Sequence, residues 1–205
     1  MRPNTSPCLK RWFDIVVSST LLALFSPLML LIALAIKLDD GGPVFYVDHR
    51  AGKDGREFGL CKFRSMVVGA DGMGLGRAVA EDDSRITRVG GILRRLTLDE
   101  LPQFLNVLKG DMSLVGPRPG TPDQASAYDR TERRRLEVRP GMTGWAWIHG
   151  RNNPTWQQRI EMDLWYVDHW TFCLDLRILA RTPTKVLSGE GLYGNEGTTP
   201  DFKGH

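Results

Sequence analysis

The chain has 205 residues, with 27 Lys and Arg against 24 Asp and Glu, and a formal net charge of +3. This length suits one globular domain with a hydrophobic core. The mild positive charge argues against a nucleic-acid binder, so no nucleic acid is expected as a partner. The four histidines lack metal-ligand spacing, and the three cysteines are far apart, which indicates reduced thiols rather than a zinc site or a disulfide framework.

One strongly apolar segment lies near the N-terminus, at residues 13–36. It is long enough to span a bilayer, since about 20 apolar residues suffice. Pro27 follows Ser26 in its middle and frees the carbonyl of Ala23 from its helical hydrogen bond. In lipid that carbonyl needs a partner, and the Ser26 hydroxyl is a local one. We therefore expect a break at Ser26 and Pro27.

Basic residues flank this segment on both sides: Lys10 and Arg11 precede it, and Lys37 follows it. Because basic residues favour the cytoplasmic side, both ends are expected there. Each half has about 12 residues, or roughly 18 Å of helix, which is enough to enter one leaflet and return. We expect a re-entrant helix-break-helix at residues 1–38, with a bent transmembrane helix as the alternative.

The rest of the chain predicts a compact cytoplasmic domain at residues 39–190 and a glycine-rich tail at 191–205. A turn cluster, two short apolar runs and the glycine-flanked turn between them are typical of a β-hairpin. Apolar periodicity indicates amphipathic helices, some of them at the membrane interface. The fold class is therefore α+β and mainly helical. The expected strands are 44–47 and 58–63, and the expected helices are 86–96, 99–109, 156–170 and 174–187.

The most informative local feature is the adjacent carboxylate pair Asp99 and Glu100. Pro102 fits the first turn of a helix, so the helix is expected to begin near Asp99, and Thr97 with Glu100 fits a capping box. Gly110 is expected to end this helix. Most acidic pairs at such positions only cap a helix, but the residues that follow favour another role.

Arg118 lies between Pro117 and Pro119, shortly after the acidic pair. A carboxylate can attack phosphorus, a second carboxylate can hold a divalent cation, and a guanidinium can bind phosphate oxygens. Two carboxylates repel a diphosphate unless a cation offsets their charge, and Mg²⁺ prefers such oxygen ligands. These residues indicate phosphate chemistry at Asp99 and Glu100, with Mg²⁺ as the expected cofactor.

Several short motifs occur in order along nearly the whole chain. They are Lys-Phe-Arg-Ser-Met at 62–66, Arg-Ile-Thr-Arg-Val-Gly at 85–90, Leu-Asp-Glu-Leu-Pro-Gln at 98–103, Leu-Val-Gly-Pro-Arg-Pro at 114–119, Arg-Pro-Gly-Met-Thr-Gly at 139–144, Gly-Arg-Asn at 150–152 and Leu-Asp-Leu-Arg-Ile-Leu at 174–179. Together they resemble the bacterial sugar transferases of the small monotopic phosphoglycosyl transferase family.

The resemblance implies transfer of a sugar 1-phosphate from a UDP-sugar to undecaprenyl phosphate, with release of UMP, as the first membrane step of glycoconjugate biosynthesis. It implies a monotopic enzyme on the cytoplasmic face of the bacterial inner membrane, in contact with phospholipid. Such an enzyme can form homo-oligomers or associate with downstream glycosyltransferases. Asp99 would be the nucleophile of a covalent aspartyl-phosphosugar intermediate, and Glu100 its partner in holding Mg²⁺. The residues expected to bind substrate are Lys62, Arg64, Arg88, Arg118 and Arg151.

Two positions depart from the family pattern, because Asp48 and Trp147 stand where glutamine is usual. They bear on the choice of sugar, which the sequence leaves open together with the glycan pathway and the oligomeric state. Two other classes of function stay open at this point. A non-catalytic protein could bind anionic lipid through its arginines, and a phosphohydrolase could pass the same aspartyl-phosphate to water.

Overall fold

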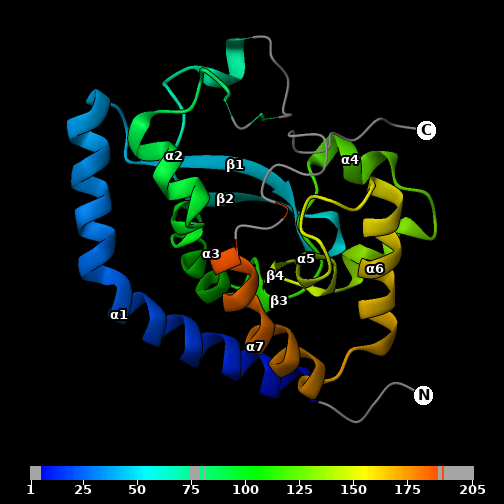
Figure 1. Ribbon diagram of the computed structural model, residues 1–205. Coiled ribbons are helices and arrows are strands. Elements are labelled where there is room, and N and C mark those ends of the chain that lie inside the picture. Colours follow the sequence, from blue (N-terminus) through cyan, green and yellow to red (C-terminus); the bar gives the residue numbers. More distant parts are fainter. Residues whose placement is uncertain (1–5, 74–78, 81, 189–190, 192–205) are drawn as a thin grey trace.

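The computed structural model describes residues 6–73, 79–80, 82–188 and 191, and within them the chain is mostly helical with a small amount of β-structure (Figure 1). Short 3₁₀ turns lie at 53–55, 70–73, 98–100 and 132–137. The helices and strands are α1 (Pro7–Asp40), β1 (Phe45–Ala51), β2 (Glu57–Phe63), α2 (Arg88–Arg95), α3 (Gln103–Lys109), β3 (Ser113–Val115), α4 (Pro122–Ala127), β4 (Gly141–Thr143), α5 (Trp145–Ile148), α6 (Trp156–His169) and α7 (Phe172–Ser188).

Helix α1 is continuous over 34 residues and changes direction near its middle (Figure 1). Pro27 lies inside the helix, and Ser26 Oγ donates a 2.9 Å hydrogen bond to the carbonyl of Ala23, the partner expected from the sequence. Proline bends a helix because it lacks an N–H and crowds the preceding turn. The expected pair of separate helices is thus one bent helix, because the bonds around the kink keep the helical path intact. Its re-entry into one leaflet stays a prediction.

Leucine side chains are exposed along much of α1. Leu24, Leu30, Leu31, Leu34 and Leu38 are each more than half exposed. Among the described residues, α1 is the one helix that is long and apolar enough to cross a membrane, judged by length and composition. A row of exposed leucines of this extent marks a lipid or protein contact surface. We conclude that the chain associates with a membrane through α1.

Buried polar contacts fix the first half of α1 against the rest of the chain. Lys10 Nζ lies 2.5 Å from Asp175 Oδ2 of α7 and donates a 3.0 Å hydrogen bond to the carbonyl of Val115. Asp14, which is 2% exposed, accepts a 3.1 Å hydrogen bond from the backbone N–H of Leu114. Strand β3 ends three residues before Arg118, so these contacts set the position of α1 relative to the Pro-Arg-Pro segment.

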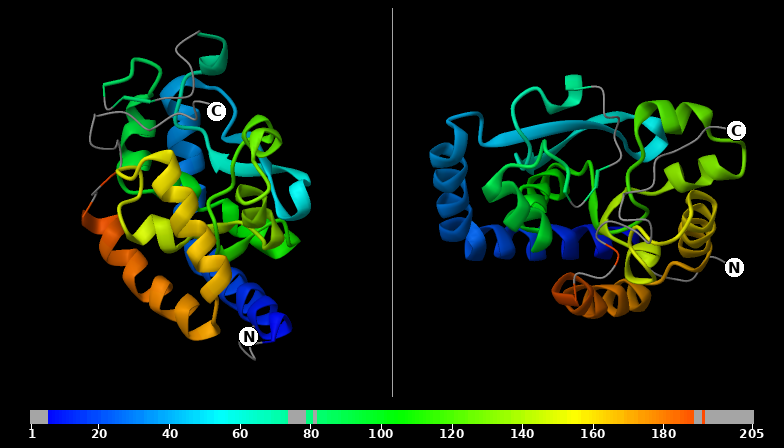
Figure 2. Two further views of the ribbon diagram at one scale, coloured as in Figure 1. Left: turned by 90° about the vertical axis from the view of Figure 1, so that its right-hand side faces the viewer. Right: turned by 45° about the horizontal axis from the view of Figure 1, so that its top comes forward.

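The two views of Figure 2 place the remaining elements around this frame. The ribbon β1–β2 runs across one side of the molecule, and α2 and α3 lie between it and α1. Helix α7 lies along the first half of α1, where Phe13 and Phe172 meet edge to face with ring centroids 5.2 Å apart. Helix α6 lies on the side opposite the second half of α1 (Figures 1 and 2).

Both pairs of strands are short. β1 and β2 are antiparallel, from Phe45 opposite Phe63 to Ala51 opposite Glu57, which confirms the predicted hairpin with somewhat longer strands. β3 and β4 are parallel and were not predicted, because three-residue strands leave no periodic signal. A Cβ at Gly116 would lie 2.4 Å from the carbonyl oxygen of Arg139, so this close backbone approach requires glycine.

The main hydrophobic core lies between α3, β3, α5, α6 and α7. Val107, Met112 and Ile178 are fully buried at its centre. The predicted helices at 156–170 and 174–187 are confirmed as α6 and α7, and Thr155 caps α6 in a capping box with Gln158. This core holds the segments that carry the site.

Candidate active site

The acidic pair lies on a 3₁₀ turn, Leu98–Glu100, rather than in the first turn of an α-helix. Helix α3 begins only at Gln103, and the predicted capping box is wrong, because Thr97 makes no capping hydrogen bond. The backbone of Thr97 is left-handed, with φ of 58°, and this conformation prevents its side chain from capping the turn. The prediction that Gly110 ends the helix is confirmed, with φ of 95°.

Strand β2 brings Lys62 to the acidic pair. Burial lowers the pKa of the Lys62 ammonium group, and the carboxylates of Glu100 and Asp99 oppose that change, whereas the charges of Arg118 and Arg50 add to it. Each of these groups must lie close to Lys62 to affect it. Lys62, Asp99, Glu100 and Arg118, which are distant in sequence, therefore share one site.

The Asp99 carboxyl has a strongly perturbed pKa. Burial and the neighbouring charge of Glu100 raise the pKa of Asp99 to about 6, although Lys62 and Arg94 act in the opposite direction. A carboxylate with this pKa is ionised at pH 7 and is held beside a like charge at a cost in free energy. Perturbation of this kind is typical of catalytic carboxylates.

The adjacent carboxylates suit a divalent cation. Within the described part of the chain, no group of three or more His, Cys, Asp or Glu side chains gathers as a complete metal site. Mg²⁺ does not need one, because it is usually held by one or two carboxylates together with substrate phosphates and water. The repulsion between Asp99 and Glu100 is the feature that such a cation would relieve.

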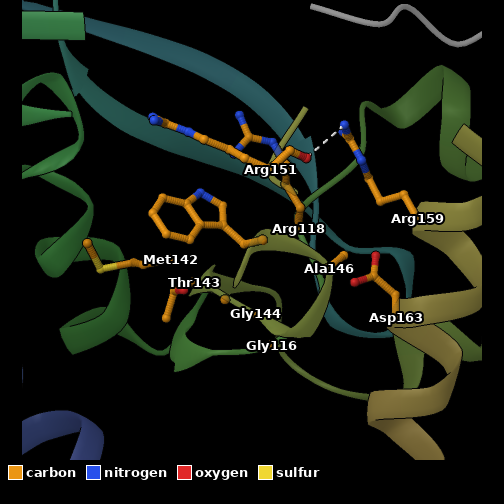
Figure 3. Close-up of a pocket in the computed structure, with 11 residues that line it drawn as sticks. Gly116, Arg118, Met142, Thr143, Gly144, Ala146, Arg151, Arg159 and Asp163 are labelled. Carbon is orange, nitrogen blue, oxygen red and sulfur yellow. Dashed lines mark hydrogen bonds between the residues drawn. The ribbon is translucent and has the colours of Figure 1, made fainter. Parts of the chain in front are cut away.

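Beside this site lies a pocket into which several arginines project (Figure 3). Arg118 and Arg151, both expected from the sequence, line it together with Arg159, which was not. Arg151 is 8% exposed, its guanidinium lies over the Trp147 ring at 5.2 Å, and it donates a 3.0 Å hydrogen bond to Thr97 Oγ1. The other lining residues are Gly116, Gly141, Met142, Thr143, Gly144, Ala146, Trp147 and Asp163.

Helix α6 supplies the functional residues that sequence reasoning missed. Arg159 and Asp163 are one helical turn apart and are 6% and 1% exposed. Asp163 pairs with the buried Arg135 at 2.6 Å, so this ion pair is internal. The spacing of Arg159 and Asp163 on one helix face was the available signal, but it is common on exposed helices as well.

Arg64, one of the expected substrate-binding residues, is engaged at the end of α1. Arg64 forms a bidentate ion pair with Asp40 and donates a 2.6 Å hydrogen bond to the carbonyl of Pro43, so its guanidinium holds the end of α1. Arg88 is exposed at the first residue of α2. Arg94, at the other end of α2, lies near enough to lower the pKa of Asp99. Arg94, which was not among the expected substrate-binding residues, therefore lies near the acidic pair, and the role of Arg88 stays a prediction.

The model of the family described as bacterial sugar transferase matches residues 5–189, which is nearly the entire chain. The chain belongs to the bacterial sugar transferase family. The family predicted from the ordered motifs is thus confirmed, and the matched residues include the acidic pair and the arginine pocket.

The names of similar proteins support this family assignment. The sugar transferase EpsL of Bacillus subtilis is 45% identical over 193 residues, which are 94% of each chain. A UDP-glucose:undecaprenyl-phosphate glucose-1-phosphate transferase of Caulobacter vibrioides is 44% identical over 90% of this chain and 72% of its own. The undecaprenyl-phosphate galactose phosphotransferase of Salmonella typhimurium is 42% identical over 93% of this chain and 43% of its own. These relatives confirm the predicted class of enzyme, a phosphoglycosyl transferase.

Proposed function

We propose that this bacterial sugar transferase moves a sugar 1-phosphate from a UDP-sugar to undecaprenyl phosphate and releases UMP. The observation that carries the proposal is the pair Asp99 and Glu100 beside Lys62, which also lies near Arg118, with the pKa of Asp99 raised to about 6 by burial and by Glu100. Relatives that cover most of this chain are named for the same reaction on glucose and on galactose.

In the first step, a carboxylate oxygen of Asp99 attacks the β-phosphorus of the UDP-sugar. The bond between that phosphorus and the bridging oxygen breaks, UMP leaves with the electron pair, and the phosphosugar stays on Asp99 as an acyl phosphate. In the second step, a phosphate oxygen of undecaprenyl phosphate attacks the same phosphorus. The Asp99 carboxylate leaves, and the product is a polyprenyl diphosphosugar.

The neighbouring residues have separate roles in these steps. Asp99 is ionised at neutral pH, as a nucleophile must be, because its pKa is about 6. Lys62 and Arg118 would offset the negative charge that builds up on the phosphate oxygens. Asp99 and Glu100 would hold Mg²⁺, which supplies further charge neutralisation when it is bound.

The membrane helix gives the second substrate a route to this site. The leucines exposed on α1 would lie in lipid, with both ends of the helix on the cytoplasmic face of the inner membrane. Lys10 and Asp14 tie the first half of α1 to strand β3 and hence to Arg118. A lipid phosphate that reaches the protein along α1 would therefore arrive beside the acidic pair.

The decisive assay follows UMP release from a panel of UDP-sugars, with and without undecaprenyl phosphate. We expect a phosphosugar adduct on Asp99 by mass spectrometry when lipid is omitted, ping-pong kinetics when it is present, and loss of both the adduct and turnover in Asp99→Asn. A ternary-complex pattern without an adduct would contradict covalent catalysis. Steady UMP release without lipid would indicate a hydrolase, and unchanged function in Asp99→Ala would indicate a lipid-binding protein.

The metal has its own test. Excess chelator should abolish turnover, and added Mg²⁺ should restore it, because the two carboxylates repel a diphosphate without a cation between them. Full activity in chelator would remove the metal from the mechanism.

A further inference from the structure

Neighbouring groups satisfy the charge and the hydrogen-bond donors of the buried Arg159 guanidinium only in part. Its side chain is 6% exposed, and its Nε has no hydrogen-bond partner among residues 6–73, 79–80, 82–188 and 191. Its Nη2 donates only long hydrogen bonds, 3.3 Å to the carbonyl of Arg151 and 3.5 Å to Asn152 Oδ1. Buried charges are normally paired, so the sparse pairing of Arg159 by the protein's own groups needs a physical explanation.

The acidic residue that offsets part of the charge of Arg159 already pairs with another arginine. Asp163 is the one carboxylate among the described residues that line the pocket, and it pairs with Arg135 at 2.6 Å. Burial lowers the pKa of Arg159 to about 10, and the charge of Arg118 adds to this effect while Asp163 only partly opposes it. Arg118 and Arg151 line the same pocket, so positive charge exceeds negative charge there.

Two of the pocket's arginines, Arg118 and Arg151, connect it to the neighbourhood of the acidic pair. Arg118 lies close enough to influence both Lys62, which adjoins Asp99 and Glu100, and Arg159. Arg151 makes a second link through its hydrogen bond to Thr97, two residues before Asp99. Figure 3 shows the hydrogen bond from the Arg159 guanidinium to the carbonyl of Arg151, with Arg118 lining the same pocket. A ligand that places one phosphate at Asp99 can place a second anionic group against these guanidinium groups.

We propose that Arg159, together with Arg118 and Arg151, binds a phosphate group of the substrate that does not react with Asp99. This inference rests on the proposed function and adds a binding residue to it. Two phosphate esters have the required chemistry: the α-phosphate of the nucleotide, and the phosphate of the isoprenyl acceptor while it waits for the second step. A guanidinium binds either through charge-assisted hydrogen bonds.

The test compares phosphate ligands with their phosphate-free counterparts on the full-length protein in nanodiscs. Calorimetry would measure the affinities of wild type and Arg159→Gln for UMP against uridine, and for farnesyl phosphate against farnesol. We expect Arg159→Gln to weaken one phosphate ligand about tenfold or more, with uridine and farnesol unchanged. Loss of UMP affinity assigns the subsite to the nucleotide, and loss of farnesyl phosphate affinity assigns it to the acceptor.

Two further variants exclude simpler explanations. Arg130→Gln removes an arginine that is exposed, and it should leave all four affinities at the wild-type level. Arg159→Lys keeps the charge but not the planar fork, and it should bind with intermediate affinity, so the series remains informative if the glutamine variant does not fold. A lower melting temperature with unchanged phosphate affinity in either variant would make Arg159 a structural residue and overturn the proposal.

The affinity for inorganic pyrophosphate tests the arginine subsite independently of the proposed function. UMP release by the wild type is measured in parallel. If no UDP-sugar gives UMP, the proposed function fails, but the affinity for inorganic pyrophosphate still tests the arginines. A loss of about tenfold in Arg159→Gln would support an anion subsite, and equal affinity in both proteins would overturn it. If turnover is normal and both proteins bind UMP and farnesyl phosphate equally, the subsite is wrong while the function stands.

Discussion

Thr97 and Arg151 both have left-handed backbones, with φ of 58° and 55°, and a 3.0 Å hydrogen bond joins the Arg151 guanidinium to Thr97 Oγ1. Positive φ is uncommon outside glycine and costs on the order of 1–3 kcal/mol, most clearly at a β-branched residue such as threonine. Each residue adjoins a functional group, because Thr97 precedes Asp99 by two positions and Arg151 lines the pocket. The bond thus couples the turn of the acidic pair to the arginine pocket.

Removing this hydrogen bond should impair catalysis more than folding. Thr97→Val keeps the branched shape but loses the acceptor, and we expect kcat to fall about tenfold while the free energy of unfolding falls by about 1 kcal/mol. Turnover assays and denaturant melts would measure the two effects. Thr97→Ser, which keeps the hydroxyl, is the matched control and should retain most activity. Equal kcat in the valine variant and the wild type would show that the bond does not position Asp99.

Replacing Asp99 should stabilise the protein at neutral pH while it abolishes turnover. The folded-state pKa of Asp99 is raised from 3.8 to about 6, so its contribution to stability is most favourable below about pH 4 and is lost as pH rises through 6. Asp99→Asn removes that repulsion, and we expect the melting temperature to rise by a few degrees at pH 7.5 and by nothing near pH 4.

The control for this change is Asp82→Asn, because Asp82 is exposed and lies away from the acidic pair in sequence. Its melting temperature should equal that of the wild type at both pH values. A lower melting temperature for Asp99→Asn at pH 7.5 would mean that the Asp99 carboxylate stabilises the fold, against the burial that raises its pKa.

The pH dependence of kcat/KM should report the ionisation of the Asp99 carboxyl. Asp99 must lose its proton before it attacks phosphorus, so kcat/KM for the UDP-sugar should fall tenfold per pH unit below an apparent pKa at or somewhat below 6. A bound cation beside the carboxylate would shift this limb toward lower pH, because positive charge favours the ionised form. Initial rates between pH 4.5 and 8 at constant ionic strength would check it. A profile that is flat throughout this range would contradict an Asp99 pKa near 6 in the working enzyme.

The sequence predicts the acidic pair in one site with Lys62 and Arg118, because each lies in a motif whose residue types suit phosphate chemistry, and the mutual charge effects on Lys62 agree with their proximity. It did not distinguish Arg64 from Arg159. Both are arginines in helix or strand contexts, and only tertiary packing shows that Arg64 meets Asp40 while Arg159 meets a pocket. The 3₁₀ turn at the acidic pair was also missed, because the left-handed Thr97 that precedes it, whose hydroxyl bonds a residue 54 positions away, leaves no local sequence signal.

Arg64 should therefore matter for stability rather than for substrate affinity. Arg64→Lys keeps the charge but loses the bidentate pair with Asp40 and the bond to Pro43, so we expect a melting temperature several degrees lower, with the KM for the UDP-sugar within about twofold of wild type. Lys53→Arg, at an exposed turn position, is a control for the Lys–Arg difference and should be neutral. A large increase in KM without a change in melting temperature would return Arg64 to the substrate site.

The bend in α1 leads to the prediction about topology. Pro27 prevents a straight helix, and the Ser26 hydroxyl satisfies the carbonyl of Ala23 at the kink, so residues before Arg11 and after Lys37 should lie on the same, cytoplasmic face. In a background without the three native cysteines, single cysteines at positions 6 and 42 should both resist an impermeant thiol reagent added to sealed spheroplasts and react after lysis.

Pro27→Ala restores the missing N–H and should straighten the helix, whose 34 residues are long enough to span the bilayer. We expect the cysteine at position 6 to become reactive from outside in that variant. External labelling of position 6 in the wild-type helix would instead establish a transmembrane orientation and exclude the re-entrant one.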